Sequence, residues 1–112
     1  MTYEKLVKKV YNCAMKADAR DVNEHIAVQF DIFGEGEGAL YVEIKKGRID
    51  VQPYEYYDRD AVVYVEADTL LDVLSGKLKK KEAMAKGKLV VQGNYEATIK
   101  LLNILIKKKS NK

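Results

Sequence analysis

Residues 95–106 constrain the fold most, because they predict a helix that is too apolar to be an ordinary surface helix. The segment reads YEATIKLLNILI, and its second half is almost entirely leucine and isoleucine. These side chains cover more than the ~100° stripe that an amphipathic helix turns towards a core. One side can pack on a sheet, and the surplus requires a second apolar partner. A ligand, a second subunit or a lipid surface could supply it.

Upstream of that helix, alternating apolar residues predict a sheet with one apolar face. Residues 26–32, 40–45 and 48–52 alternate apolar and polar side chains, which is typical of half-buried strands. The glycine-rich residues 34–38 and the Lys46-Gly47 pair suit hairpin turns between them. Residues 61–67 (AVVYVEA) are apolar on both sides, so we expect this fourth strand inside the sheet.

Helical signals surround these strands. Residues 3–17 carry apolar side chains at helical spacing, and residues 17–23 read as a loop. After the fourth strand we expect a helix capped by Asp68 or Thr69 and ended by Gly76. A lysine-rich helical stub over residues 79–86, a fifth strand over 88–92 and the closing helix with Asn94 as its cap complete the domain. A frayed basic tail over residues 107–112 is expected to follow.

Composition indicates a single globular domain, residues 1–112, of the cytoplasm. The lone cysteine excludes an internal disulfide and suits a reducing compartment. No run approaches the ~18 apolar residues that a membrane span needs. Charge is uneven: residues 1–66 carry a net charge of −4 and residues 67–112 a net charge of +7. That basic third could touch an anionic membrane surface, although lysines that keep an apolar segment soluble explain it as well.

The chain offers little for catalysis, metal binding or nucleic-acid binding. His25 is the only histidine, and no cysteine, histidine or carboxylate cluster has ligand spacing. No serine or cysteine stands beside a base that could activate it. Three tyrosines in residues 54–57 fall in the acidic half, away from the lysines, which argues against a single-strand platform. We therefore expect no enzyme, no cofactor, no metal and no nucleic-acid partner, and expect these tyrosines in a surface loop over the sheet edge.

Two segments carry a family resemblance. Residues 70–78 (LLDVLSGKL) and 83–94 (AMAKGKLVVQGN), followed by Ala97, Lys100 and Leu101, resemble the sterol carrier protein type-two domain. The resemblance covers about a third of the chain, and the order of elements agrees upstream. The resemblance implies an α+β fold: a five-stranded mixed, largely antiparallel sheet, one face of which the N-terminal, middle and C-terminal helices cover, enclosing an apolar tunnel. It also implies binding and transfer of lipid without catalysis. Because residues 110–112 are not the Ser-Lys-Leu peroxisomal signal, we expect a prokaryotic stand-alone member of the family.

From this we predict a binding site without titratable groups. The resemblance places six residues at core or tunnel positions, namely Leu70, Leu74, Met84, Leu101, Leu102 and Leu105. Apolar strand residues would form the floor beneath them, namely Phe30, Ile32, Leu40, Val42, Ile44, Val51 and Leu89. The ligand would be a sterol, a fatty acid, a fatty acyl-CoA or a phospholipid.

Two alternatives stay open. In the first, the closing helix buries its surplus face in a homodimer and the tunnel is collapsed; Leu102→Asp would then give monomers. In the second, the chain is a small isomerase acting on a lipid-like substrate. That enzyme would need a buried carboxylate, for which Asp31 and Glu66 are the strand candidates.

Overall fold

The computed structural model describes residues 1–106 of the chain. The elements follow the order helix, four strands, two helices, strand, helix. They are α1 (Tyr3–Met15), β1 (Ile26–Phe33), β2 (Gly38–Lys45), β3 (Arg48–Gln52), β4 (Ala61–Glu66), α2 (Ala67–Ser75), α3 (Lys80–Ala85), β5 (Leu89–Gly93) and α4 (Tyr95–Ile106). The predicted basic tail, with its lysines at 107–109, lies outside the described residues.

The five strands form one sheet in the order β3-β2-β1-β4-β5. Both hairpins, β1–β2 and β2–β3, are antiparallel, and β5 pairs antiparallel with β4. Only β4 and β1 run parallel, because the chain crosses between them through residues 34–60. The prediction of a mixed, largely antiparallel α+β sheet is confirmed, and so is the interior place of β4.

Turn residues explain the hairpin between β2 and β3. Lys46 and Gly47 have φ values of +54° and +75°, the left-handed conformation that a two-residue hairpin turn requires at both positions. Glycine adopts this conformation without strain, and lysine does so at a small cost. The strand then ends at Gln52, directly before Pro53, which cannot donate to a ladder.

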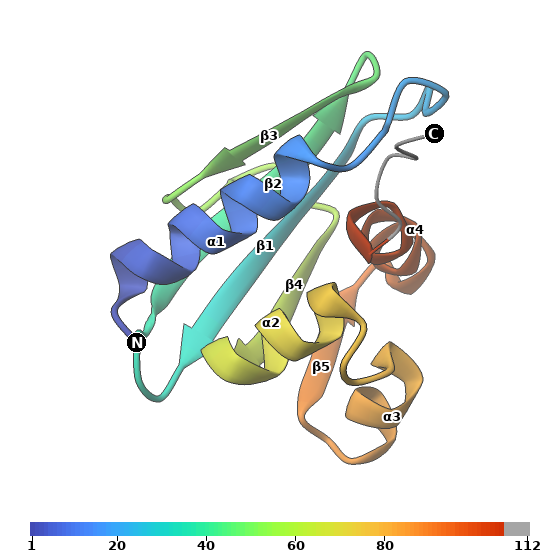
Figure 1. Ribbon diagram of the computed structural model, residues 1–112. Helices are drawn as coiled ribbons and strands as arrows, with labels where there is room; N and C mark the ends of the chain where they lie inside the picture. The colour runs from blue at the N-terminus through green and yellow to red at the C-terminus, as the bar shows by residue number, and fades with distance from the viewer. Residues whose placement is uncertain (107–112) are drawn as a thin grey trace.

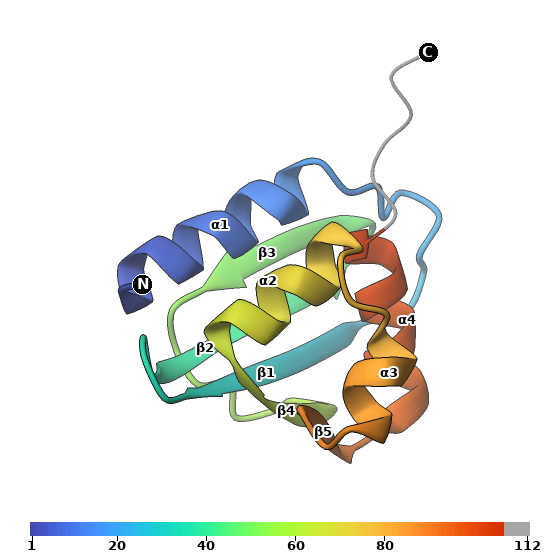
Figure 2. The same cartoon turned by 60° about the horizontal axis from the view of Figure 1, so that its bottom comes forward.

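The helices lie on one face of the sheet. Figures 1 and 2 show α1, α2 and α4 on the same side, while the opposite side carries no helix within residues 1–106. The register places Phe30 opposite Leu40 on β2 and beside Val63 on β4, so one continuous apolar face runs across the strands. We call this the inner face of the sheet. The other, the outer face, carries residues such as Tyr41 and Glu43.

One predicted helix start is wrong. We expected Asp68 or Thr69 to cap the middle helix, but α2 begins at Ala67 and Glu66 occupies the cap position without a side-chain hydrogen bond. The chain passes from β4 into α2 with no intervening loop, so the helix starts earlier than its capping residues suggest. The other helix signals are confirmed: Asn94 Oδ1 accepts from the Ala97 N–H at 2.9 Å, and Gly76 ends α2 with φ +86°.

Candidate functional site

Between the inner face and the helices lies one layer of buried apolar side chains, which we call the interlayer core. Its largest members are at most 2% exposed to solvent. They come from α1, from the strands of the sheet and from α2 and α4. The interlayer core includes Leu6, Val10, Val28, Phe30, Ile32, Leu40, Val42, Ile44, Val51, Val63, Val65, Leu70, Val73, Leu74, Leu89, Leu101, Leu102 and Leu105.

The structure brings the predicted site residues together. Twelve of the thirteen belong to the interlayer core, with exposures between 0% and 6%. Met84 on α3 is partly buried at its edge, where its Sδ accepts from the Tyr95 hydroxyl at 3.7 Å. These side chains pack against one another, so their role as a ligand site stays a prediction. The sequence patterns therefore identified which residues lie together in the interlayer core.

Helix α4 contributes three leucines to the layer and has further apolar side chains that are only partly buried. Leu101, Leu102 and Leu105 are fully buried, and α4 packs across β1, β4 and β5. Ile104 and Ile106 on the same helix are only partly buried. A helix whose apolar side chains extend beyond the face it buries has more hydrophobic surface than this packing uses.

Sequence reasoning missed the contributions of α1 and β4 to the site. Leu6 and Val10 project into the layer from α1, and Val63 and Val65 reach it from β4. The helical spacing of the first pair and the alternation of the second already indicated buried faces. What the patterns did not indicate was that these faces meet the leucines of α4.

A cavity of about 270 Å³ opens at the edge of the interlayer core, between α1 and α2. Its described lining combines cationic, polar and apolar side chains: Lys9, Asn12, Cys13, Lys16, Leu71, Leu74 and Ser75. Leu74 belongs to both the cavity wall and the core. The Cys13 thiol also donates to the Leu105 carbonyl at 3.4 Å, which ties α1 to the C-terminal end of α4.

The two carboxylates of the isomerase alternative do not enter this layer. Asp31 is on the outer face, where its Oδ1 accepts from Gln29 Nε2 at 2.8 Å. Glu66 is exposed at the end of β4. Neither is the buried carboxylate that an enzyme acting on a lipid-like substrate would need.

Polar clusters lie on the outer face and in the loop after β3. Tyr56 stacks on Tyr41 with ring centroids 4.7 Å apart, and its hydroxyl donates to Glu43 Oε2 at 2.9 Å. The tyrosine-rich segment is therefore a surface loop as expected, but it crosses the outer face rather than an edge. Tyr57 beside it is 94% exposed.

Two further observations concern ligands and membranes. Within residues 1–106, no three His, Cys, Asp or Glu side chains gather closely enough to hold a metal ion. Over the same residues, no helix has the length and apolarity to cross a bilayer.

Comparison with known proteins extends the resemblance to almost the whole domain. The sequence profile of the SCP-2 sterol transfer family matches residues 4–105. Hydroxysteroid dehydrogenase-like protein 2 of the mouse is 35% identical over 78 residues, which are 69% of this chain and 16% of that protein. The bovine protein is 32% identical over 78 residues, or 69% of this chain and 19% of its own length. The chain thus spans less than a fifth of these curated relatives.

Solved structures share the fold. The palmitated SCP2L2 of Aedes aegypti superposes with a TM-score of 0.69 at 18% identity, covering 99% of this chain and 100% of that one. The sec-alkylsulfatase Pisa1 of a Pseudomonas species gives a TM-score of 0.74 at 14% identity, covering 87% of this chain but 16% of the enzyme. At such identities the likeness shows the fold alone. The profile match over residues 4–105 goes further, and on that basis the chain belongs to the SCP-2 sterol transfer family.

Proposed function

We propose that this chain binds and carries a lipid in the interlayer core. The profile match of a sterol transfer family over residues 4–105 is the observation that carries the proposal. The chemistry of the layer supports it, because its large side chains are all apolar and offer a lipid tail shape and hydrophobicity. The chain would act as a carrier rather than as an enzyme.

The energy of such a site comes from transfer of the lipid tail out of water. Burying ~10 methylene groups at ~0.8 kcal/mol each contributes roughly 8 kcal/mol before the costs of association. To admit a tail, helices α2 and α4 would have to separate slightly from the sheet. The partly exposed Ile104 and Ile106 of α4 supply apolar surface that a tail could cover.

The ligand class includes sterols, fatty acids, fatty acyl-CoA and phospholipids, and fatty acids are the first choice. The palmitated mosquito relative shares the fold over nearly the whole of both chains. The single cysteine of this chain would remain reduced in the cytoplasm, which is where we propose that it works.

A direct test is native mass spectrometry with lipid extraction on protein purified from cells, joined to titration with a fluorescent fatty acid. A co-purified lipid and saturable binding are expected. Leu105→Trp, which overfills the core, should weaken binding, whereas Val90→Trp on the exposed outer side of β5 should leave it unchanged. Absence of bound lipid together with no fatty-acid binding by folded wild-type protein would refute the proposal.

The homodimer alternative needs a different variant from the one that the sequence suggested. Leu102 is 0% exposed, so Leu102→Asp would disrupt the fold rather than a surface contact. Ile104 and Ile106 are the apolar α4 residues that a partner could reach. Light scattering that gives a stable dimer, and monomers after Ile104→Lys, would favour the dimer over the carrier if no lipid is found.

A further inference from the structure

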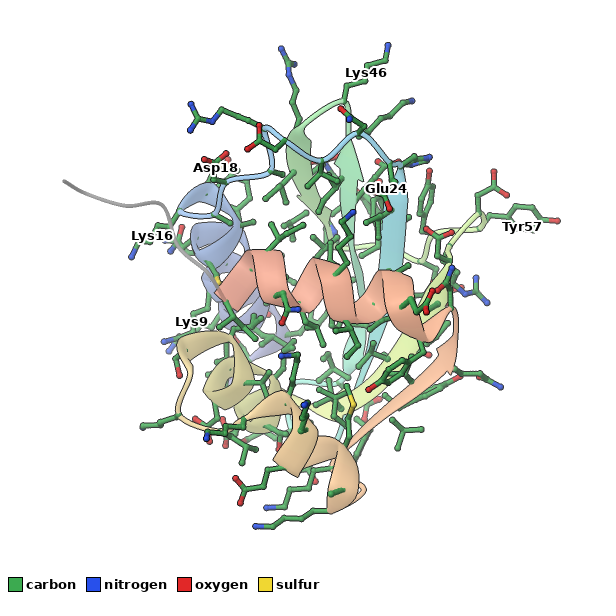
Figure 3. All side chains as sticks on the ribbon, turned by 90° about the vertical axis from the view of Figure 1, so that its right-hand side faces the viewer. Lys9, Lys16, Asp18, Glu24, Lys46 and Tyr57 are labelled. Carbon is green, nitrogen blue, oxygen red and sulfur yellow. The ribbon has the colours of Figure 1, made fainter. Side chains whose placement is uncertain are left out.

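The cavity between α1 and α2 has a charged rim and an apolar floor. Lys9 on α1 and Lys16, the residue that caps the end of α1, are about two helical turns apart, and both line it. Figure 3 shows both lysines on the α1 side of the molecule, with Lys9 next to α2 and Lys16 farther along, at the end of α1. Within residues 1–106 neither lysine forms an ion pair, so both ammonium groups are available to an anion. No described lining residue is acidic.

The floor of the cavity leads into the interlayer core. Leu71 and Leu74 line it from α2, and Leu74 is itself a core residue that is 3% exposed. The bond from the Cys13 thiol to the Leu105 carbonyl brings the end of α4 to the same place. The cavity therefore borders the buried leucines of α2 and the end of α4.

Size decides which part of a ligand the cavity can take. Sites that enclose a whole drug-sized ligand have volumes of ~300–1,000 Å³. At about 270 Å³ this cavity is smaller, so it can hold a head group and the first carbons while the rest lies elsewhere. Asn12 adds an amide donor to the two lysines, and carboxylate oxygens accept from all three; the Ser75 hydroxyl is already used, because it donates to the Asp72 carbonyl at 3.2 Å.

We propose that Lys9 and Lys16 hold the carboxylate of a fatty acid at the mouth of the α1–α2 cavity, while its tail enters the interlayer core past Leu74. This rests on the proposed function and specifies its ligand as an anionic single-chain amphiphile. The chain has a larger cavity, of about 630 Å³, at the β2–β3 hairpin. Its described lining carries three cations as well, but Glu43 and Asp50 stand among them, and it includes no core leucine into which a tail could pass.

The experiment compares a fluorescent stearic acid with its methyl ester, which keeps the tail and removes the charge. Wild-type protein should bind the acid more tightly than the ester. Lys9→Gln combined with Lys16→Gln should weaken acid binding about fivefold, as expected for two partly solvated charge pairs, and leave ester binding unchanged. Added salt should reduce the preference of wild-type protein for the acid over the ester, because salt screens the charges of the lysines.

Lys81→Gln combined with Lys88→Gln is the matched control. Both of these lysines are exposed, neither lines the cavity, and the pair removes the same total charge. Acid binding should therefore stay at the wild-type level. An equal loss in both double variants would assign the effect to net charge and overturn the proposal.

Ligand binding at the cavity itself can be measured through the reactivity of Cys13, because it is the only cysteine and lines the cavity wall. Stearic acid should slow its alkylation by a small thiol reagent, and the Lys9/Lys16 variant should need about fivefold more acid for the same protection. Binding of acid and ester with equal affinity, or with no protection of Cys13, overturns the site but leaves the carrier function standing. Binding of neither by folded protein refutes the carrier function instead.

Discussion

At the scale of single residues, Glu43 joins three parts of the outer face. Its Oε2 accepts from the Tyr56 hydroxyl and lies 2.5 Å from His25 Nε2, so β2, the loop before β4 and the start of β1 are tied together. Partial burial raises the pKa of Glu43, but hydrogen bonds from His25 and Tyr56 outweigh it and hold the pKa below the ordinary 4.5. The bond to Glu43 raises the pKa of Tyr56 to about 12, so its phenol stays a donor at neutral pH.

The first prediction is that Glu43→Gln loses stability at neutral pH and not in acid. Because folding lowers the pKa of Glu43, its contribution is present above pH 4.5 and disappears as the pH falls through the lower pKa of the folded state. Urea unfolding at neutral pH and in acid would measure the difference in unfolding free energy between wild type and variant. A difference that stays constant from neutral to acidic pH would contradict this account.

The second prediction concerns Gly93, where β5 ends against the start of β4. Its φ is +115°, and an added Cβ would lie 2.7 Å from the Asp60 carbonyl oxygen. Gly93→Ala should cost about 1–3 kcal/mol of unfolding free energy. Gly76→Ala is the control, because Gly76 also has a positive φ but nothing lies within 4 Å of its Cβ position. Chemical denaturation should show the larger loss at Gly93; equal losses would leave only the backbone conformation as the cause.

At the scale of elements, strand faces could be predicted because alternation records burial directly. The pattern placed Val63 and Val65 on the opposite side from Val62 and Tyr64, and the register of β4 confirms it. The parallel pairing of β4 with β1 could not be read this way, since period two is the same in both pairings. The start of α2 was predicted wrongly because aspartate is a favoured N-cap residue type, which pointed to Asp68. In the structure β4 continues directly into the helix, which therefore begins earlier.

The candidate site likewise has one part that could be predicted from the sequence and one part that could not. Most of the apolar layer was predictable from strand alternation, from helical spacing and from the family resemblance, whereas the part that α1 and β4 contribute was not assigned to it. The α1–α2 cavity was not, because Lys9 and Leu71 are far apart in the chain and only helix packing makes them neighbours. Lysines on a helix surface are ordinarily solvated, so nothing in the sequence distinguished these two.

The third prediction is that α4 stabilises the fold through its buried leucines. Leu102→Ala should lower the free energy of unfolding by about 2–5 kcal/mol, through lost burial and a residual cavity. Asn103→Ala on the exposed side of the same helix should stay within about 0.5 kcal/mol of wild type. Urea unfolding of both variants measures this, and similar small effects would mean that α4 is not part of the cooperative core.

At the scale of the whole molecule, a carried lipid should act on folding stability. A ligand that binds only the folded protein adds about 2.7 kcal/mol at a free concentration of 100 times its Kd. The fourth prediction is therefore that stearic acid raises Tm in wild-type protein, as measured by differential scanning calorimetry. The overfilled Leu105→Trp variant should show a smaller shift; an equal shift would mean that the acid binds outside the interlayer core.

The position of α4 has a consequence for synthesis. This helix, which closes the layer over β1, β4 and β5, is the last described element to be made. Until α4 emerges from the ribosome, it cannot cover Phe30, Val63 and the neighbouring core residues of the nascent chain. Apolar surface exposed in this way promotes aggregation, which chaperones commonly prevent. The nascent chain therefore completes its apolar core only after α4, the last described element, has been made.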